Sequence, residues 1–357
     1  MNRVFIDLTH LGRHVTGIER VAIEQFEKVR FDGAELTMIR ARGVVSMILK
    51  QQILLPLLAF LYPRAQFAFP GFPPSPFFAL ISGRTILYVH DTFLLTRRAD
   101  LSTKARLYMA PQFAIAVRHL KRFFVNSEKT ARELAEHVRP DARILLYRPA
   151  VKNHFGLDAS ERFRSAAKPA PLKIVSMGTV EPRKNYAAAL AILDEIRANF
   201  DSDAELHIIG RSGWGHEGAA IAEHPGVTVH GYLAAEDVKA ALKAADIYLC
   251  TSHDEGLGLP LLEAQFAGLP VAAPDQPVFR EVLAQSGTFI RTENPAEAAS
   301  AITALLSTPG SRQAWAERSM RNVERWNDLA DDDFCSVRTI FAEDDRGVAN
   351  TAIEGRA

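Results

Sequence analysis

Two glutamates, Glu255 and Glu263, stand eight positions apart in the stretch "SHDEGLGLPLLEAQFAGLPV" (252–271), on either side of a glycine-rich turn and Pro260. Glycines let backbone N–H groups approach a ligand without side-chain obstruction, and a proline suits the first turn of a helix, where a missing N–H costs nothing. The start of a helix favours anions, diphosphate above all. The stretch therefore fits a ligand with hydroxyls at both ends and a diphosphate in the middle, such as a nucleotide sugar.

The segment that carries Glu255 is predicted to leave a buried strand. The apolar run "DIYLCTS" (246–252) is typical of such a strand, and His253, Asp254 and Glu255 follow it directly. In doubly wound domains, ligands bind beyond the carboxyl ends of the parallel strands. We therefore expect Glu255 at the edge of a binding cleft, and we expect Glu263, in the first turn of the next helix, to reach the same cleft.

Short apolar runs alternate with helical patterns along the whole chain, which indicates an α/β protein. The expected strands lie at 3–8, 85–91, 122–127, 143–149, 173–180, 205–211, 227–232, 246–252 and 270–275. The stretch 156–171 is rich in small residues and proline and is typical of a linker. Two such runs joined by a linker predict two Rossmann-like, doubly wound domains facing each other across a cleft.

Length and composition agree with two domains of an ordinary globular protein. The chain has 357 residues, of which 48% are hydrophobic and 24% charged, and 357 residues exceed what one compact core usually holds. Only two cysteines occur, and the opening "MNRVFIDL" reads as a strand and not as an export signal, so a reducing cytoplasm is expected.

The net charge of zero hides an imbalance between the two halves. Residues 1–165 contain 25 Lys and Arg against 14 Asp and Glu, a balance of +11, and the remaining 17 basic against 28 acidic residues give −11. This split suggests that the first half faces something anionic, although two differing solvated surfaces remain the alternative.

Several blocks beyond the two glutamates follow the order of one known family. The spacing of Glu255 and Glu263 resembles the E-x7-E signature of retaining glycosyltransferases of the GT-B fold, family 4. "GTVEPRKNYAAAL" (178–190) resembles that family's phosphate-binding turn. The remaining matching blocks are "LHIIGRSGWGHE" (206–217), "VHGYLAAEDVKAAL" (229–242) and "DQPVFREV" (275–282) in the second half, and "FIDLTHLGRHVTGIERV" (5–21) and "YVHDTFLL" (88–95) in the first. The latter two resemble the subgroup that builds bacterial surface polysaccharides.

The resemblance implies roles for residues of the second half. Glu263 would bind the ribose hydroxyls and Glu255 the hydroxyls of the donor sugar. Arg183 and Lys184 would neutralise the diphosphate, since the leaving group gains negative charge as the glycosidic bond breaks. The backbone at Gly178, Gly258 and Leu259 would help to hold the donor.

Two residues of the first half also match the family's motifs. Gly17, in "TGIER", would be a close-approach glycine facing the phosphates, with a simple turn glycine as the alternative. His90, in "YVHD", would contact the donor sugar near the reacting carbon, with a packed core histidine as the alternative. His10, His207 and His230 are expected to be structural, as is His14.

We expect no bound metal and no cofactor. A literal D-x-D motif occurs at Asp201-Ser202-Asp203, but it precedes the strand at 205–211 and so falls on the wrong side of the sheet for a ligand. The run Asp331-Asp332-Asp333 lies in a helical pattern and is expected to be exposed. No His/Cys cluster has the spacing of metal ligands.

The segment 44–80, "VVSMILKQQILLPLLAFLYPRAQFAFPGFPPSPFFAL", is heavily apolar. Lys50 and Pro56 are expected to interrupt it too early for a membrane span. It is then either a core helix followed by an irregular loop or a surface that rests on the bilayer or grips a lipid-linked acceptor. The basic character of the same half, including Arg118, Lys121 and Arg122, favours peripheral association with the anionic inner face of the cytoplasmic membrane.

Together these features predict four parts of the chain. Residues 1–165 form an acceptor-binding domain and 166–325 a nucleotide-sugar-binding domain. Residues 326–345 form a helix that packs back on the first domain, and 346–357 are a disordered tail or the remnant of an expression tag, because "IEGR" (353–356) resembles a protease site.

The resemblance implies a metal-independent, retaining transfer of a hexose to a lipid-linked or lipopolysaccharide glycan. GDP-mannose is the favoured donor and a UDP-sugar the next candidate. The alternatives are a GT-B enzyme acting on a soluble acceptor, or a degenerate scaffold protein that only binds nucleotide sugars. Nucleic acid is not an expected partner.

Overall fold

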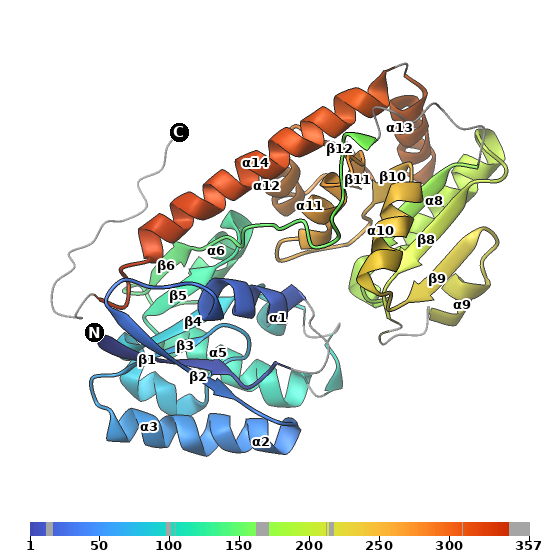
Figure 1. The fold of residues 1–357 in the computed structure, drawn as a ribbon. Helices are drawn as coiled ribbons and strands as arrows, with labels where there is room; N and C mark the ends of the chain where they lie inside the picture. The colour runs from blue at the N-terminus through green and yellow to red at the C-terminus, as the bar shows by residue number, and fades with distance from the viewer. Residues whose placement is uncertain are drawn as a thin grey trace. The chain divides into compact units, whose positions relative to one another are not determined.

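The chain forms two compact units, each built on one six-stranded sheet (Figure 1). The structure is a computed structural model that describes residues 1–11, 17–97, 101–103, 105–161, 171–211, 213, 218–308 and 310–342. The first unit comprises Met1–Pro149 together with the C-terminal part of the chain from Asp331, and the second comprises Ala150–Ala330. The boundary expected from the linker composition lies at residue 165, sixteen residues beyond Pro149.

The first unit contains a parallel sheet with the strand order β2-β1-β3-β4-β5-β6. Its strands are β1 (Asn2–Leu8), β2 (Ala34–Arg40), β3 (Gln66–Phe69), β4 (Thr85–Val89), β5 (Arg122–Val125) and β6 (Arg143–Leu146). The sequence predicts four of these, and β2 and β3 are additional. Helices cover the sheet, as is usual for parallel sheets, and the strands are therefore buried, which suits their apolar sequences.

Helices connect these strands. They are α1 (Gly17–Ala22), α2 (Val44–Leu49), α3 (Leu55–Leu61), α4 (Phe93–Thr96), α5 (Ala110–His119) and α6 (Glu128–Ala135), with helical turns of other types at Ile23–Glu27, Lys50–Leu54, Pro76–Arg84 and Ala105–Met109. The predicted N-cap of α6 is confirmed, because the Ser127 side chain accepts a hydrogen bond from the Thr130 backbone N–H at 3.1 Å.

Residues Val44–Leu61 form one continuous helical segment, in which α2 and α3 lie end to end (Figure 1). The expectation that Lys50 and Pro56 break this segment was wrong. The Lys50 Nζ reaches back to donate to the Arg40 carbonyl at 2.6 Å, and Pro56 follows a π-helical turn as the second residue of α3, where its missing N–H is tolerated. By length and composition the segment could cross a membrane. Only 17% of it is buried inside the protein, unlike a core helix of the same composition.

One face of this segment packs on the first sheet and the other is exposed and apolar. Leu55 and Ala59 are buried in the core, and the Gln51 side chain donates to Asp7 Oδ2 at 3.0 Å. The exposed apolar face consists of Val44, Val45, Ile48, Leu49, Ile53, Leu57, Phe60, Leu61 and Tyr62. The interpretation as a simple core helix is therefore wrong, because most large side chains of the segment lie outside the core.

The second unit repeats the α/β pattern with the strand order β12-β11-β10-β7-β8-β9, again parallel. Its strands are β7 (Lys173–Met177), β8 (Glu205–Ile209), β9 (Val227–Gly231), β10 (Ile247–Leu249), β11 (Val271–Pro274) and β12 (Gly287–Ile290). The first five match predicted strands, and β12 is additional. Its helices are α8 (Tyr186–Asn199), α9 (Gly218–Glu223), α10 (Ala235–Ala244), α11 (Leu259–Gln265), α12 (Pro277–Leu283) and α13 (Pro295–Ser307), with a short 3₁₀ turn at Pro182–Lys184.

The long C-terminal helix α14 (Ser311–Val337) belongs to both units. Its last turns pack on the first unit, where the Arg148 guanidinium lies 3.0 Å from the Asp333 carboxylate and the Phe31 ring contacts those of Phe334 and Phe341. The prediction of a C-terminal helix that returns to the first domain is thus confirmed. Asp333 was expected to be exposed, and this was wrong, because Arg148 holds it half-buried.

Candidate functional site

The candidate site of the second unit lies where its strand order reverses. From β7 the chain proceeds to β8 and β9 on one side, and then crosses to β10, β11 and β12 on the other. Ligands of doubly wound sheets bind at such a switch point, beyond the carboxyl ends of the strands. The loop after β7 carries Arg183 and Lys184, and the loop after β10 carries Glu255, so the switch point brings these predicted residues together.

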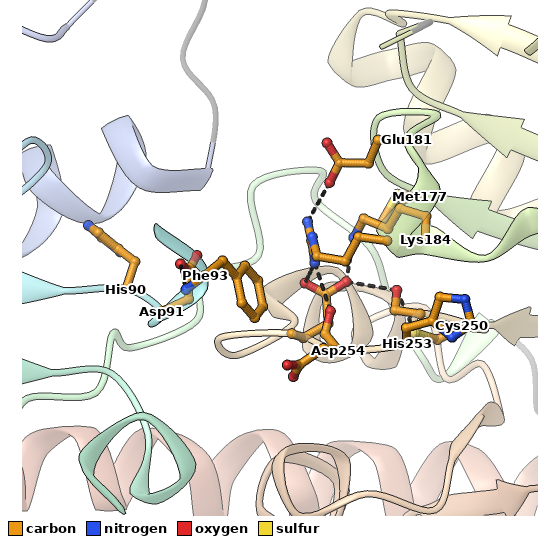
Figure 2. A network of polar contacts seen from close by, with 12 residues as sticks. His90, Asp91, Phe93, Met177, Glu181, Lys184, Cys250, His253 and Asp254 are labelled. Atoms are coloured by element: carbon orange, nitrogen blue, oxygen red, sulfur yellow. Dashed lines mark hydrogen bonds and ion pairs between the residues drawn. The ribbon is translucent and has the colours of Figure 1, made fainter. Parts of the chain in front are cut away.

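Glu255 is paired with both predicted cations, of which Figure 2 labels Lys184. Its Oε2 lies 2.6 Å from Arg183 Nη1, and its Oε1 lies 2.5 Å from Lys184 Nζ. The Ser252 hydroxyl also donates to Oε1, at 2.8 Å. Glu255 is 8% exposed, and a charge removed from water to that extent needs partners of this kind.

The pairing fixes the ionisation state of Glu255. Burial acts to raise the pKa of this carboxyl, but the charges of Lys184 and Arg183 and the hydrogen bonds from Lys184 and Ser252 outweigh it and lower the pKa to about 2. Glu255 is therefore a carboxylate at neutral pH and not a proton donor. Nearby, burial and the Glu255 charge raise the pKa of the Cys250 thiol, which stays protonated.

A second carboxylate holds Arg183 in place. Glu181, labelled in Figure 2, has its Oε1 2.6 Å from Arg183 Nη2, whereas Glu255 contacts Nη1. The two carboxylates therefore bind different nitrogens of one guanidinium group. Arg183 Nη1 also donates to the Asp254 carbonyl at 2.9 Å, and the Arg183 carbonyl accepts from the His253 N–H at 2.9 Å. The loops after β7 and β10 are thereby tied to each other. Sequence reasoning assigned no role to Glu181, although its place two residues before Arg183 was visible.

Glycine is required at Gly178 for Lys184 to reach Glu255. Gly178 has a φ of +149°, a backbone conformation that L residues rarely adopt, and a Cβ there would lie 2.8 Å from Lys184 Cε and 3.0 Å from its Nζ. The Gly178 carbonyl also accepts from the Tyr186 hydroxyl at 3.2 Å. A side chain at this position would displace the ammonium group from the site.

Gly258 and Leu259 lie at the start of α11 as expected. Gly258 adopts a left-handed conformation with a φ of +90°, which favours glycine. Glu263 is the fifth residue of α11 and 5% exposed. The sequence placed Glu263 in the first turn of this helix, and this was wrong. The helix begins at Leu259 and one turn takes about 3.6 residues, so Glu263 lies in the second turn.

The space at these loops is small. A cavity of about 10 Å³ is lined by residues of both loops, among them Lys184, Glu255 and Gly258. Such a volume suits about one water molecule. Glu255 occupies the position between the two cations, so a diphosphate that contacts Arg183 and Lys184 competes with this carboxylate.

His90 lies at the carboxyl end of β4 in the first unit (Figure 2). Burial lowers its pKa to about 4, despite an opposing hydrogen bond to Pro70, so the ring is neutral at pH 7. His90 Nε2 lies 2.7 Å from the Pro70 carbonyl oxygen, which can only accept, so Nε2 carries the proton and Nδ1 is the acceptor. A neutral ring with an acceptor nitrogen can receive a hydrogen bond from a sugar hydroxyl.

The other histidines and Gly17 differ in their surroundings. Gly17 begins α1 and is exposed, and a Cβ added there would meet no described atom within 4 Å, so the described neighbours do not require glycine. His10 packs against Gly71 and Phe72, and both of its ring nitrogens are buried without a hydrogen-bond partner among the described residues. His207 and His230 stack on each other with ring nitrogens 3.0 Å apart. His14 lies outside the described residues.

The first aspartate of the D-x-D motif stabilises a turn. Asp201 accepts hydrogen bonds from the Leu172 and Asp203 backbone N–H groups at 2.8 and 3.0 Å, at the amino end of β8. Within the described ranges, no three His, Cys, Asp or Glu side chains are grouped so that they could hold a metal ion.

The fold of the two units is the GT-B fold of glycosyltransferases. The chain is similar to the structure of a sucrose-phosphate synthase from Thermosynechococcus elongatus (TM-score 0.69, 12% identity, 96% of this chain and 100% of that one). It is also similar to WaaG, a glycosyltransferase involved in lipopolysaccharide biosynthesis (TM-score 0.66, 18% identity, 95% and 99%).

Residues 158–321 match the family described as Glycosyl transferases group 1. The match covers 164 of the 357 residues, and it names the family of retaining glycosyltransferases that the sequence resembles. The prediction of family and fold is confirmed.

Among its relatives are mannosyltransferases. Over 143 residues the chain is 30% identical to the serotype-specific mannosyltransferase WbdA of Escherichia coli, a match that covers 38% of this chain and 17% of WbdA. It is 31% identical over 155 residues to the phosphatidyl-myo-inositol mannosyltransferase of Mycolicibacterium smegmatis (strain ATCC 700084 / mc(2)155), covering 41% and 39%. The chain thus spans less than half the length of these relatives.

Proposed function

We propose that this protein is a metal-independent, retaining glycosyltransferase that moves a hexose from a nucleotide diphosphate sugar to a glycan acceptor. The observation that carries this proposal is the buried carboxylate of Glu255 held between Arg183 and Lys184 at the switch point of the second sheet. Two cations and one carboxylate at this edge suit a ligand with a diphosphate beside sugar hydroxyls.

The charge of the site supports a rearrangement on donor binding. Arg183 and Lys184 carry two positive charges, and Glu181 and Glu255 carry two negative ones, so the four side chains are neutral together. A bound diphosphate competes with Glu255 for the cations. Once released from them, the Glu255 carboxylate can accept hydrogen bonds from the donor sugar, as its family motif implies.

In the reaction the cations act on the leaving group. As the glycosidic bond breaks, negative charge grows on the diphosphate, and Arg183 and Lys184 stabilise this charge more in the transition state than in the ground state. This is the work that a metal ion does in other transferases. Glu263 would bind the ribose, the Gly258 and Leu259 amides the phosphates, and neutral His90 the sugar near the reacting carbon.

The donor and acceptor are proposed from the relatives. Similarity to WbdA and to a phosphatidyl-myo-inositol mannosyltransferase favours GDP-mannose over a UDP-sugar. The same relatives, and the fold shared with WaaG, favour a lipid-linked or lipopolysaccharide glycan made for the cell surface. In this scheme the first unit binds the acceptor and the second the donor.

The exposed apolar face of Val44–Leu61 supports a location on the inner face of the cytoplasmic membrane. Phe60 is 78% exposed and Val45 72%, and water-facing apolar surfaces of this kind commonly bind membranes or partners. Exposed Arg42 and Arg64 flank the two ends of the segment, where they can contact anionic headgroups. Because residues of the opposite face, such as Leu55, are packed on the sheet, the helix would lie in the interface and not cross the bilayer.

A soluble acceptor is the alternative that the fold itself supports, since sucrose-phosphate synthase shares it. A purified-protein transfer assay separates the candidates. GDP-mannose and UDP-sugars are each offered with a lipid-linked glycan extract or with free sugars, in the presence of a chelator. Transfer from GDP-mannose to the lipid-linked fraction is the expected result. Transfer to free sugars only would show that the acceptor is soluble. Binding of nucleotide sugars without any transfer would favour a scaffold protein that only binds them.

A further inference from the structure

A hollow of about 410 Å³ lies on the second unit, away from the donor loops. It is formed by the segment Ala284–Ser286, which immediately precedes β12, and by α14. The amino end of β12 lies at the edge of the parallel sheet opposite to the carboxyl ends of β7 and β10. The hollow is therefore distinct from the site built on Arg183 and Glu255.

Three arginines from one face of α14 line the hollow. Arg318, Arg321 and Arg325 follow each other at intervals of three and four residues, which places them on the same side of a helix. No carboxylate is among the lining residues, and no ion pair involves Arg318 or Arg321 within the part of the chain that the structure describes. Residues 166–357 contain only 17 basic against 28 acidic residues. A cluster of three arginines is therefore not expected from the acidic composition of this part of the chain.

A buried polar network holds the floor of the hollow. The Asn322 amide donates to Gln265 Oε1 at 2.7 Å, and the Gln265 amide donates to the Ser286 hydroxyl at 2.6 Å. All three residues are at least 95% buried. Buried polar groups that are fully hydrogen-bonded to one another are rigid, so the loop before β12 is fixed against α14.

The same network orients the third arginine. Arg325 Nε donates to Asn322 Oδ1 at 2.9 Å, and its Nη2 donates to the Glu281 and Val282 carbonyl oxygens at 3.0 Å. Arg318 lies over the Trp315 ring, with its guanidinium carbon 4.9 Å from the ring centroid. Arg325 is thus held in place before any ligand arrives, which lowers the entropic cost of binding.

We propose that this hollow binds the phosphate group of a small soluble phosphate ester. A phosphomonoester carries about −1.5 to −2 charges at pH 7 and three terminal oxygens, which suits a hollow lined by three arginines better than a carboxylate with one charge and two oxygens does. Guanidinium groups bind such oxygens in pairs, with directional hydrogen bonds. The volume leaves room for a sugar-sized body beside the phosphate. Gln285 supplies a further side-chain amide at the wall.

Isothermal titration with inorganic phosphate and with glucose 1-phosphate tests this assignment. The double variant Arg318→Gln/Arg321→Gln removes the two exposed arginines and leaves the network at Arg325 intact, and circular dichroism checks its fold. Arg183→Gln serves as the control for binding at the donor loops. We expect both probes to bind the wild-type protein and Arg183→Gln equally well, and to bind the double variant about tenfold or more weakly.

Three results would overturn the proposal. These are absence of binding at millimolar probe concentrations, equal affinity of the wild type and the double variant, and loss of binding in Arg183→Gln alone. Vesicles of phosphatidylcholine with and without phosphatidylglycerol separate a lipid headgroup from a soluble ester. If the double variant loses vesicle binding while neither soluble probe binds, the phosphate belongs to a lipid and the soluble assignment is wrong.

Discussion

The Nζ of Lys184 lies 2.5 Å from Oε1 of Glu255, at the meeting point of the loops that follow β7 and β10. The two side chains are only 15% and 10% exposed, so the pair is far less screened by solvent than a surface ion pair. A diphosphate bound at Lys184 competes with the same contact that stabilises these loops. Stability and donor binding are therefore linked at this contact.

Replacing Lys184 with Met is expected to reduce kcat/KM by about 100-fold or more, since removal of a group that stabilises developing charge commonly has this effect. Steady-state transfer assays measure it. The matched control is Lys243→Met, which removes an exposed ion pair with Glu161 and should change kcat/KM little. Equal losses in both variants would show that Lys184 acts only through general stability.

The pH dependence of unfolding should report on Glu255. Its pKa is about 2 in the folded protein against 4.5 for an unperturbed glutamate, so its ionised form stabilises the fold above pH 4.5. This stabilisation is lost as the pH falls from 4.5 towards 2 and amounts to about 3 kcal/mol. Chemical denaturation of wild type and Glu255→Gln across this range measures it. Parallel curves for the two proteins would contradict the buried ion pairs.

Gly178→Ala should impair the site more than the fold. The new methyl group would displace the end of the flexible Lys184 side chain, and the positive φ adds about 1 kcal/mol of strain. Donor affinity should fall while the protein remains folded. Gly231→Ala is the control, because Gly231 also has a positive φ, +69°, but no described atom lies within 4 Å of its Cβ position. An equal loss of donor affinity in both variants would show that Gly178 has no specific role in positioning Lys184.

Membrane association should depend on the outer face of Val44–Leu61. Leu57→Glu/Phe60→Glu is expected to weaken binding to vesicles containing phosphatidylglycerol by about tenfold or more, because each large apolar side chain contributes about 1.5–3 kcal/mol when removed from water. Vesicle sedimentation measures this, and salt should weaken the wild-type binding. Phe200→Glu, at an exposed position of the second unit, is the control.

A different result would assign this face to another occupant. If vesicles bind neither protein and light scattering shows that Leu57→Glu/Phe60→Glu converts a dimer into a monomer, the face joins two copies of the chain. Deletion of the segment is not informative, because Leu55 and Ala59 are part of the core of the first unit.

The sequence predicted the parts of the fold that depend on strong local patterns. Continuous apolar runs marked nine of the twelve strands of the described residues, and the glycine-rich loop and Glu255 fell after the right strand. Strands β2, β3 and β12 were missed for physical reasons. β2 and β12 lie at the edges of their sheets with half-exposed side chains, and β3 falls inside the apolar segment 44–80, which has no alternating pattern to mark it. None of them carries enough periodicity to stand out.

Contacts between distant segments could not be predicted in the same way. The residues of the ion pair between Arg148 and Asp333 lie 185 positions apart in the sequence, and those of the pair between Glu255 and Arg183 lie 72 positions apart. The sequence indicated which residues gather at the donor loops but not that they neutralise one another. The helical continuity of Val44–Leu61 was also missed, because the π-helical turn that accommodates Pro56 has no sequence signal.

A crystal structure of the protein with a bound nucleotide diphosphate sugar would decide whether these loops hold the donor. We expect phosphate oxygens within hydrogen-bond distance of Arg183 and Lys184, the ribose beside Glu263, and Glu255 turned from the cations towards the hexose. A nucleotide sugar bound elsewhere on the chain, with the pair of Lys184 and Glu255 intact, would contradict this account.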